Sequence, residues 1–145
     1  MLTSKVYDRL FVDVFNFILK KEQTTLKQGE FSDLSINELH TLDVIDRTPH
    51  NKMRDVANKL EITLSTFTTA VNNLTKKGYV ETRRSTKDKR VVTIKLTDKA
   101  KKALEAHDRF HTAMVSEAVN SLSENEKVVL ESALGKLCDF FISIN

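Results

Sequence analysis

Residues 54–97 read RDVANKLEITLSTFTTAVNNLTKKGYVETRRSTKDKRVVTIKLT, and this stretch decides the fold. Its first part has apolar residues three and four positions apart, which is the spacing of a short amphipathic helix. A second amphipathic run follows almost at once, and after it two β-branched segments flank a basic loop. This order predicts two helices joined by a tight turn, followed by a two-stranded hairpin.

The second amphipathic run predicts a helix with one apolar and one polar face. Thr63 supplies its N-cap, and Gly78 suits the left-handed residue that ends it. Its inward positions are Leu64, Phe67, Val71 and Leu74, and its outer face carries Ser65, Thr66, Thr68, Thr69, Asn72, Asn73, Thr75 and Lys76. Ser, Thr and Asn are poorer helix formers than the Glu, Lys and Gln of an ordinary exposed face. Their hydroxyl and amide groups instead suit phosphates and base edges in the major groove, so we predict that this helix reads DNA.

The hairpin predicts a wing beside that helix. Its strands are expected at 79–83 and 90–96, and the loop between them brings together Arg84, Lys87, Asp88, Lys89 and Arg90. An Arg on such a loop suits the negative potential of the minor groove. Phosphate repels Asp88, whose expected role is to hold Arg90 or to cap the turn. These features together predict a winged helix-turn-helix at 35–96 that binds duplex DNA.

Positive charge is concentrated in this region. The whole chain has 145 residues and a net charge of +3, whereas 76–102 holds eleven Lys or Arg and three acids. A basic stretch that adjoins a helix-turn-helix is the electrostatic pattern of a nucleic-acid surface.

Helices are expected on both sides of the winged region. A first helix at 4–27 has apolar residues on two sides, so a second subunit is expected to cover one of them. Ser35 with Glu38 forms a capping box for the next helix, Asn51 is expected to cap the following one, and helices at 97–121 and 123–144 complete the chain. The expected dimerisation residues are Val6, Leu10, Val14, Phe17, Leu137, Phe140 and Phe141.

Length and composition predict one domain, 1–145, that is mainly α with a small β-wing and has N- and C-terminal dimerisation helices. The chain is 40% hydrophobic and 30% charged, and it lacks a long apolar run or a signal-peptide core, so we expect a cytoplasmic protein without a membrane span. Cys138 is the single cysteine and is expected to be a small core residue.

The sequence resembles the MarR family of dimeric winged helix-turn-helix regulators along nearly its whole length. DKRVVTIKLT in the wing is the most specific part, and Ala100 stands where the family usually has Gly after LTxK. Within the family, FSDLSINELHT, ITLSTFTTAVNNL and DRFHTAMV look most like the repressors of fatty-acid biosynthesis in Gram-positive bacteria. The resemblance implies a pseudo-palindromic operator, a homodimer, and long-chain acyl-acyl carrier protein as corepressor, with its acyl chain entering between the helical layer and the DNA-binding lobe.

Three other interpretations remain open. His107 and His111 have the i, i+4 spacing of two zinc ligands on one helical face, although no nearby Cys or suitably directed carboxylate completes a site, so no metal is required. The regulator would then respond to zinc or to another small ligand. A helical protein-interaction module that binds an acidic partner is the third interpretation. An enzyme is not expected, because no nucleophile, acid-base pair or glycine-rich phosphate loop emerges from the sequence.

Overall fold

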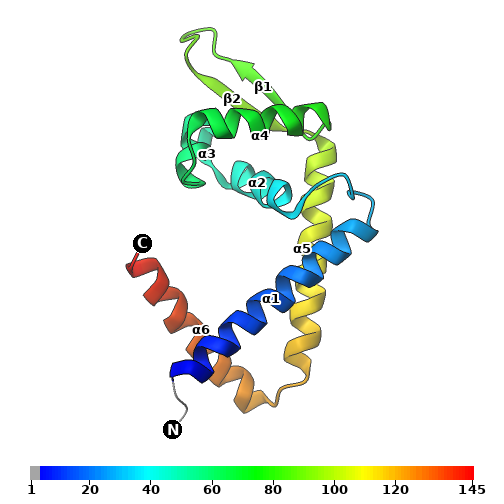
Figure 1. Cartoon of the computed structure of the whole chain (residues 1–145), viewed down its shortest axis with the longest axis vertical. Helices are drawn as coiled ribbons and strands as arrows, with labels where there is room; N and C mark the ends of the chain where they lie inside the picture. Colours follow the sequence, from blue (N-terminus) through cyan, green and yellow to red (C-terminus); the bar gives the residue numbers. More distant parts are fainter. Residues whose placement is uncertain (1–3) are drawn as a thin grey trace. The chain divides into compact units, whose positions relative to one another are not determined.

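The computed structural model describes residues 4–145 and comprises two compact units, one reaching to Leu104 and the other spanning Glu105–Asn145. The first unit contains α1 (Ser4–Gln28), α2 (Ile36–Arg47), the 3-10 turn η1 (Pro49–Asn51), α3 (Met53–Lys59), α4 (Leu64–Lys76), β1 (Val80–Arg84), β2 (Val92–Leu96) and the first residues of α5 (Figure 1). The second unit contains the rest of α5 (Asp98–Asn120) and α6 (Glu124–Ser143). The fold is mainly helical with a two-stranded wing, as predicted.

The helix starts are fixed by local side-chain hydrogen bonds. Ser35 and Glu38 form a complete capping box on α2, and Ser123 and Glu126 form another on α6. The Thr63 hydroxyl accepts the Thr66 backbone N–H at the start of α4, at 3.1 Å. The predicted caps at Ser35 and Thr63 are confirmed, because a cap depends only on residues within one turn of each other.

The core of the first unit lies where α2, α3, α4 and the wing meet. Its fully buried side chains include Leu42, Ile45, Val56, Phe67 and Leu74. Leu64 was expected to face the same core but is 42% exposed. It lies in the first turn of α4, where the helix extends beyond the core, so its side chain faces a surface groove instead.

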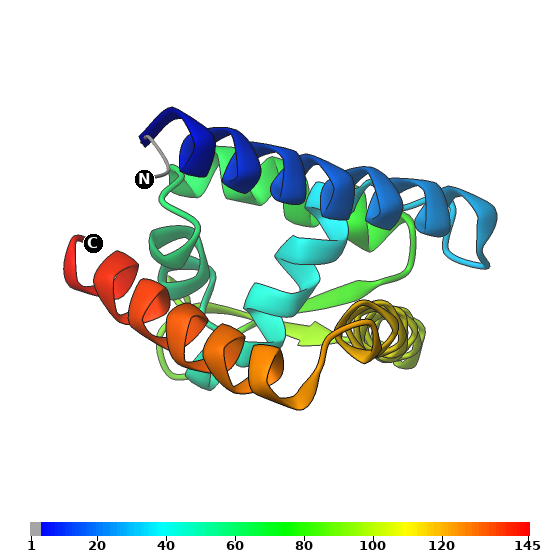
Figure 2. The ribbon, with the colours of Figure 1, turned by 90° about the horizontal axis from the view of Figure 1, so that it is seen from below.

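The wing is a regular antiparallel hairpin. Val80 pairs with Leu96 and Arg84 with Val92, so the two strands run side by side (Figure 1, Figure 2). Only Val80 of β1 is buried, whereas Ile94 and Leu96 of β2 are buried at alternate positions. The base of the wing is thus packed against the core, and the loop end of the wing is exposed to solvent.

Asn51 does not cap α3, contrary to the prediction. His50 and Asn51 both have positive φ, at 63° and 48°, and the N-cap position falls on Lys52 without a side-chain bond. The left-handed pair turns the chain so that Lys52 forms a β-bridge with Thr93, a contact from far along the sequence. The cap position is therefore set by tertiary pairing rather than by the local Asn signal.

The second unit is strongly helical and leaves much apolar surface uncovered. No residue of α6 is buried, and its exposed apolar side chains include Val129, Leu134, Phe140 and Phe141. Cys138 is exposed as well, so its expected place in a core is wrong for the single chain. Among the described residues, no helix is both long and apolar enough to cross a membrane.

Candidate nucleic-acid interface

The outer face of α4 is fully presented to solvent. The helix buries Phe67, Val71 and Leu74 on one side. The α4 residues that were predicted to contact DNA all lie on the exposed remainder of the helix: Ser65, Thr66, Thr68, Thr69, Asn72, Asn73 and Lys76. The structure therefore brings the predicted helix residues together on one continuous polar surface.

Hydrogen bonds within α4 fix the direction of its threonines. The Thr68 hydroxyl donates to the Leu64 carbonyl at 2.8 Å, and the Thr69 hydroxyl donates to the Ser65 carbonyl at 3.3 Å. A threonine held in this way has few remaining rotamers, and its oxygen can still accept a bond. The amides of Asn72 and Asn73 make no hydrogen bond within the part of the chain that the structure describes. The face thus offers fixed hydroxyls together with unengaged amides.

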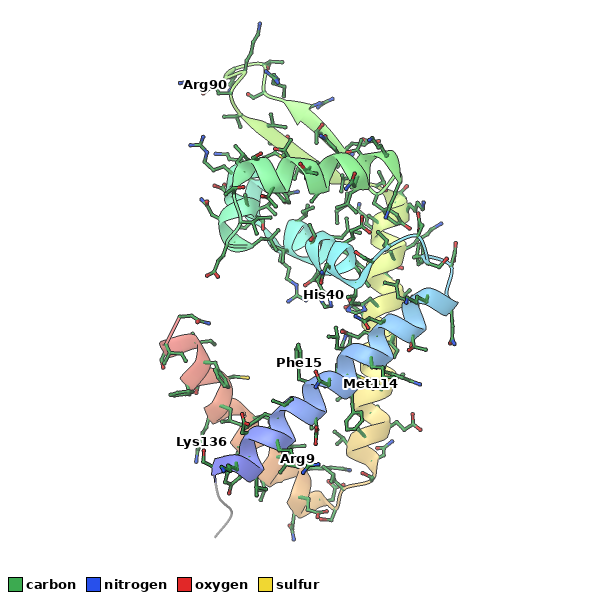
Figure 3. All side chains as sticks on the ribbon, in the orientation of Figure 1. Arg9, Phe15, His40, Arg90, Met114 and Lys136 are labelled. Atoms are coloured by element: carbon green, nitrogen blue, oxygen red, sulfur yellow. The ribbon has the colours of Figure 1, made fainter. Side chains whose placement is uncertain are left out.

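The wing loop orients one arginine. The Arg90 guanidinium donates to both carboxylate oxygens of Asp88, at 3.2 and 3.4 Å, and the Arg90 backbone N–H donates to the same carboxylate at 3.0 Å. The bond from the Arg90 side chain lowers the pKa of Asp88, which stays ionised at neutral pH. The Arg90 side chain is 91% exposed and lies at the end of the hairpin (Figure 3). The predicted holding and turn-capping contacts of Asp88 are both present.

A groove of about 650 Å³ lies between the wing and the helices α3 and α4. Thr68 and Asn72 of α4 line it together with Arg84 and Arg90 of the wing. Lys52 and Arg54, from the start of α3, also line it, and the sequence reasoning did not identify them. No local signal in the sequence marks them, because the left-handed turn at His50 and Asn51 that directs the start of α3 toward the hairpin is visible only in the structure.

The groove carries a net positive charge. Its four basic residues face two acids, Asp55 and Asp88, and Asp88 is already paired with Arg90. Lys87 and Lys89 are exposed on the loop beyond the groove. Positive side chains bordering a polar helix face form a surface that attracts phosphate while leaving amides free for base edges.

His107 and His111 lie together on α5, in the second unit. Their ring centroids are 4.5 Å apart, and each has a ligand nitrogen within 4.8 Å of the other. This spacing lets two imidazoles on one helical face approach a single divalent ion. In the first unit, His40 lies 3.5 Å from the buried carboxylate of Glu22, a pair that the sequence reasoning did not identify.

The predicted dimerisation residues lie on exposed parts of α1 and α6, except for half-buried Leu137. Leu10, Val14 and Phe17 are 53%, 55% and 71% exposed. Large apolar side chains gathered on a surface at this level of exposure are typical of a protein–protein contact.

Comparison with known proteins gives consistent matches. Residues 23–107 match the family described as "Transcriptional regulator SarA/Rot". The HTH-type transcriptional regulator BilQ of Clostridium symbiosum is 31% identical over 136 residues, which cover 93% of this chain and 90% of BilQ.

Two solved structures of protein–DNA complexes are similar in fold and sequence. FabT of Streptococcus pneumoniae, in complex with DNA, is 37% identical with a TM-score of 0.89, and the match covers 99% of this chain and all of FabT. The S. aureus MepR–DNA complex is 25% identical with a TM-score of 0.70, covering 96% of this chain and 98% of MepR.

Proposed function

The chain belongs to the MarR/SarA family of winged helix-turn-helix transcriptional regulators, and from this premise we propose that it represses transcription by binding a pseudo-palindromic DNA operator as a homodimer. It is a DNA-binding regulator and not an enzyme. The proposal places it in the cytoplasm, together with the DNA that it regulates.

The polar outer face of α4 is the observation that carries the proposal. Asn72 and Asn73 present unengaged amides, which suit bidentate contact with adenine, and the fixed threonines present methyl groups that suit thymine. Lys76 and Ser65 at the two ends of this face suit the phosphates on either side of the groove. In this proposal α4 enters the major groove and reads the bases.

The wing complements the helix. Arg90, held by Asp88, enters the adjacent minor groove, while Arg84, Lys87 and Lys89 contact phosphate. Pre-orientation by Asp88 reduces the side-chain freedom that Arg90 loses on binding, and that loss otherwise weakens the contact. The basic groove extends this set with Lys52 and Arg54.

The exposed apolar faces of α1 and α6 support a homodimer. Val6, Leu10, Val14 and Phe17 on α1, and Phe140 and Phe141 on α6, expose surface that a second copy would cover. Two-fold symmetry then gives two α4 helices, which read successive major grooves when they lie about 34 Å apart. The symmetry of the operator follows from the symmetry of the protein.

Selection from a random duplex library tests the function. We expect enrichment of a pseudo-palindrome whose half-site centres lie about 10 base pairs apart. The rival interpretation, a helical module that binds only protein, would enrich no sequence and leave DNA mobility unchanged. That result would contradict the proposed function.

Long-chain acyl-acyl carrier protein is our proposed corepressor. This step is supported by the resemblance of FSDLSINELHT, ITLSTFTTAVNNL and DRFHTAMV to the repressors of fatty-acid biosynthesis. We expect the acylated carrier protein to tighten operator binding and the unacylated carrier protein to do so less, as measured by fluorescence anisotropy. No effect of either form would remove the carrier protein from the mechanism.

Zinc is the second candidate effector, favoured by the contact between His107 and His111. Calorimetric titration with Zn²⁺ should show binding that is lost in His107→Gln and in His111→Gln. His50→Asn is the matched control, because it removes an imidazole from η1 while placing a residue that tolerates positive φ. Equal Zn²⁺ binding by all three variants would exclude the α5 pair as the site.

A further inference from the structure

Three segments of the first unit meet where α4 ends. They are the connection from α1 into the start of α2 (31–38), the turn after α4 (77–79) and the start of α5 (97–99). Lys77, the C-cap of α4, connects the turn after α4 to the segment 31–38. Its ammonium group donates to the Asp33 carbonyl at 2.6 Å and to the two Glu38 carboxylate oxygens at 2.9 and 3.0 Å.

Tyr79 makes the second connection. Its ring is fully buried and packs edge-on against Phe31, while its hydroxyl donates to the Asp33 carboxylate. That bond lowers the pKa of Asp33, and burial together with Asp33 raises the pKa of Tyr79. The phenol therefore stays the donor and the carboxylate the acceptor throughout the neutral range.

Lys99 closes the cluster from α5. Its ammonium group lies 3.5 Å from the second Asp33 oxygen and 4.3 Å from the centroid of the Tyr79 ring, and it donates to the Lys77 carbonyl at 2.8 Å. A cation over an aromatic face and beside a carboxylate is attracted by both. Asp33 thus receives contacts from the end of α4 and from the beginning of α5.

The backbone conformation of the turn after α4 is also restricted. Gly78 has φ of 83°, which other residues rarely adopt, and the Thr97 hydroxyl donates to the Gly78 carbonyl at 2.7 Å. The turn after α4 is therefore held on one side by 31–38 and on the other by 97–99. None of these side chains lies on the polar outer face of α4 that is proposed to contact DNA.

We propose that Asp33, Lys77, Tyr79 and Lys99, named here the α4 clamp, are positioning residues that fix the direction of α4 for base recognition. The inference rests on the proposed function, in which α4 reads bases in the major groove. Contacts with base edges require placement to within about half an ångström, whereas phosphate attraction tolerates larger displacements. A loosened clamp should therefore reduce discrimination between sequences and leave non-specific binding intact.

Tyr79→Phe and Asp33→Ala test the clamp, since each removes one partner of the same hydrogen bond. We expect each to weaken binding to the selected operator about 10-fold while affinity for a scrambled duplex changes less than about twofold. Asp33→Asn keeps an oxygen acceptor for Tyr79 and should recover part of the specific affinity. Asp46→Ala is the charge-matched control, because Asp46 is exposed at the opposite end of α2.

The combined variant Tyr79→Phe/Asp33→Ala should bind no more weakly than Asp33→Ala, because Asp33→Ala already lacks the bond to Tyr79. An unchanged ratio of specific to non-specific affinity in these variants would overturn the clamp, whether both affinities stay as they are or both fall by the same factor. Asp33 is half exposed, so Asp33→Ala reports on the bond even where a change to the buried ring unfolds the chain. Failure of the unmodified protein to discriminate sequences would instead overturn the proposed function itself, and the clamp with it.

Discussion

At the scale of single residues, the proposed base recognition depends on the short polar side chains of α4. Thr68 and Thr69 are tied to the helix by their own hydroxyl groups, whereas Asn72 and Asn73 keep both amide hydrogens and the amide oxygen for a partner. The two asparagines follow the two fixed threonines by one helical turn. Base discrimination should therefore depend most on the two asparagines.

Replacing Asn73 by Ala should weaken operator binding by about 1–3 kcal/mol, because a bidentate contact with a base is lost. The effect should appear only on preferred sequences, as measured by competition between operator and substituted duplexes. Asn58→Ala is the matched control, since Asn58 is an exposed amide on α3 rather than on α4. An equal loss on every duplex would mean that Asn73 contacts only the backbone.

Replacing Arg90 by Ala should weaken DNA binding on all sequences rich in A·T steps. It should also reduce the slope of the logarithm of the binding constant against the logarithm of salt concentration by about two, one for each wing of the dimer. Anisotropy titrations at several salt concentrations measure both quantities. Lys136→Ala removes an exposed positive charge from α6 and serves as the control. Unchanged affinity and slope in Arg90→Ala would remove the wing from the mechanism.

At the scale of elements, the starts of α2, α4 and α6 are specified locally. Ser35, Thr63 and Ser123 each accept a backbone N–H within their own first turn. Such signals can be read from the sequence, and the helices and strands lie close to where the periodicity predicts them. The polar face of α4 was likewise predictable, because it follows from helical spacing alone.

Features that depend on distant residues were not predictable. The Lys77 and Tyr79 contacts bridge 39 to 46 positions, and the Lys52 bridge to Thr93 moves the α3 cap away from Asn51. The basic groove has the same origin, since Lys52 and Arg54 join the wing residues only once the hairpin has folded back. Cys138 and Leu64 were misplaced because an apolar residue on a helical face does not reveal whether that face meets its own chain.

Replacing Ser35 by Ala tests the local specification of α2. The change removes the hydroxyl that accepts the Glu38 N–H and should lower the free energy of unfolding by about 0.5–2 kcal/mol in urea titrations. Ser132→Ala, in the middle of α6, should be neutral or slightly stabilising, because Ala is the better helix former there. Equal effects of the two substitutions on the free energy of unfolding would show that the capping box contributes nothing to stability beyond the helix propensity of the residue.

At the scale of the whole molecule, the exposed apolar side chains of α1 and α6 support the proposed homodimer. Phe17 is 71% exposed and Phe140 is 55% exposed in the single chain. The second copy proposed above explains this exposure and supplies the second recognition helix. The symmetry of the operator is then a consequence of the proposed dimerisation.

Replacing Phe17 by Glu should dissociate the dimer, because an unpaired carboxylate would be buried at the interface. A cost of about 2 kcal/mol or more corresponds to at least about a 30-fold weaker association, measurable by sedimentation equilibrium. Gln23→Glu adds the same charge at an exposed polar position of α1 and should leave the dimer intact. An unchanged dimer in Phe17→Glu would exclude this part of α1 from the interface.

The salt dependence of operator binding tests the central claim most directly. A dimer that places two α4 helices and two wings on duplex DNA should neutralise about eight phosphates. The logarithm of the binding constant should then fall against the logarithm of salt concentration with a slope of roughly −7. A slope near zero would contradict the account, because no surface of this protein would then be exchanging counterions with DNA.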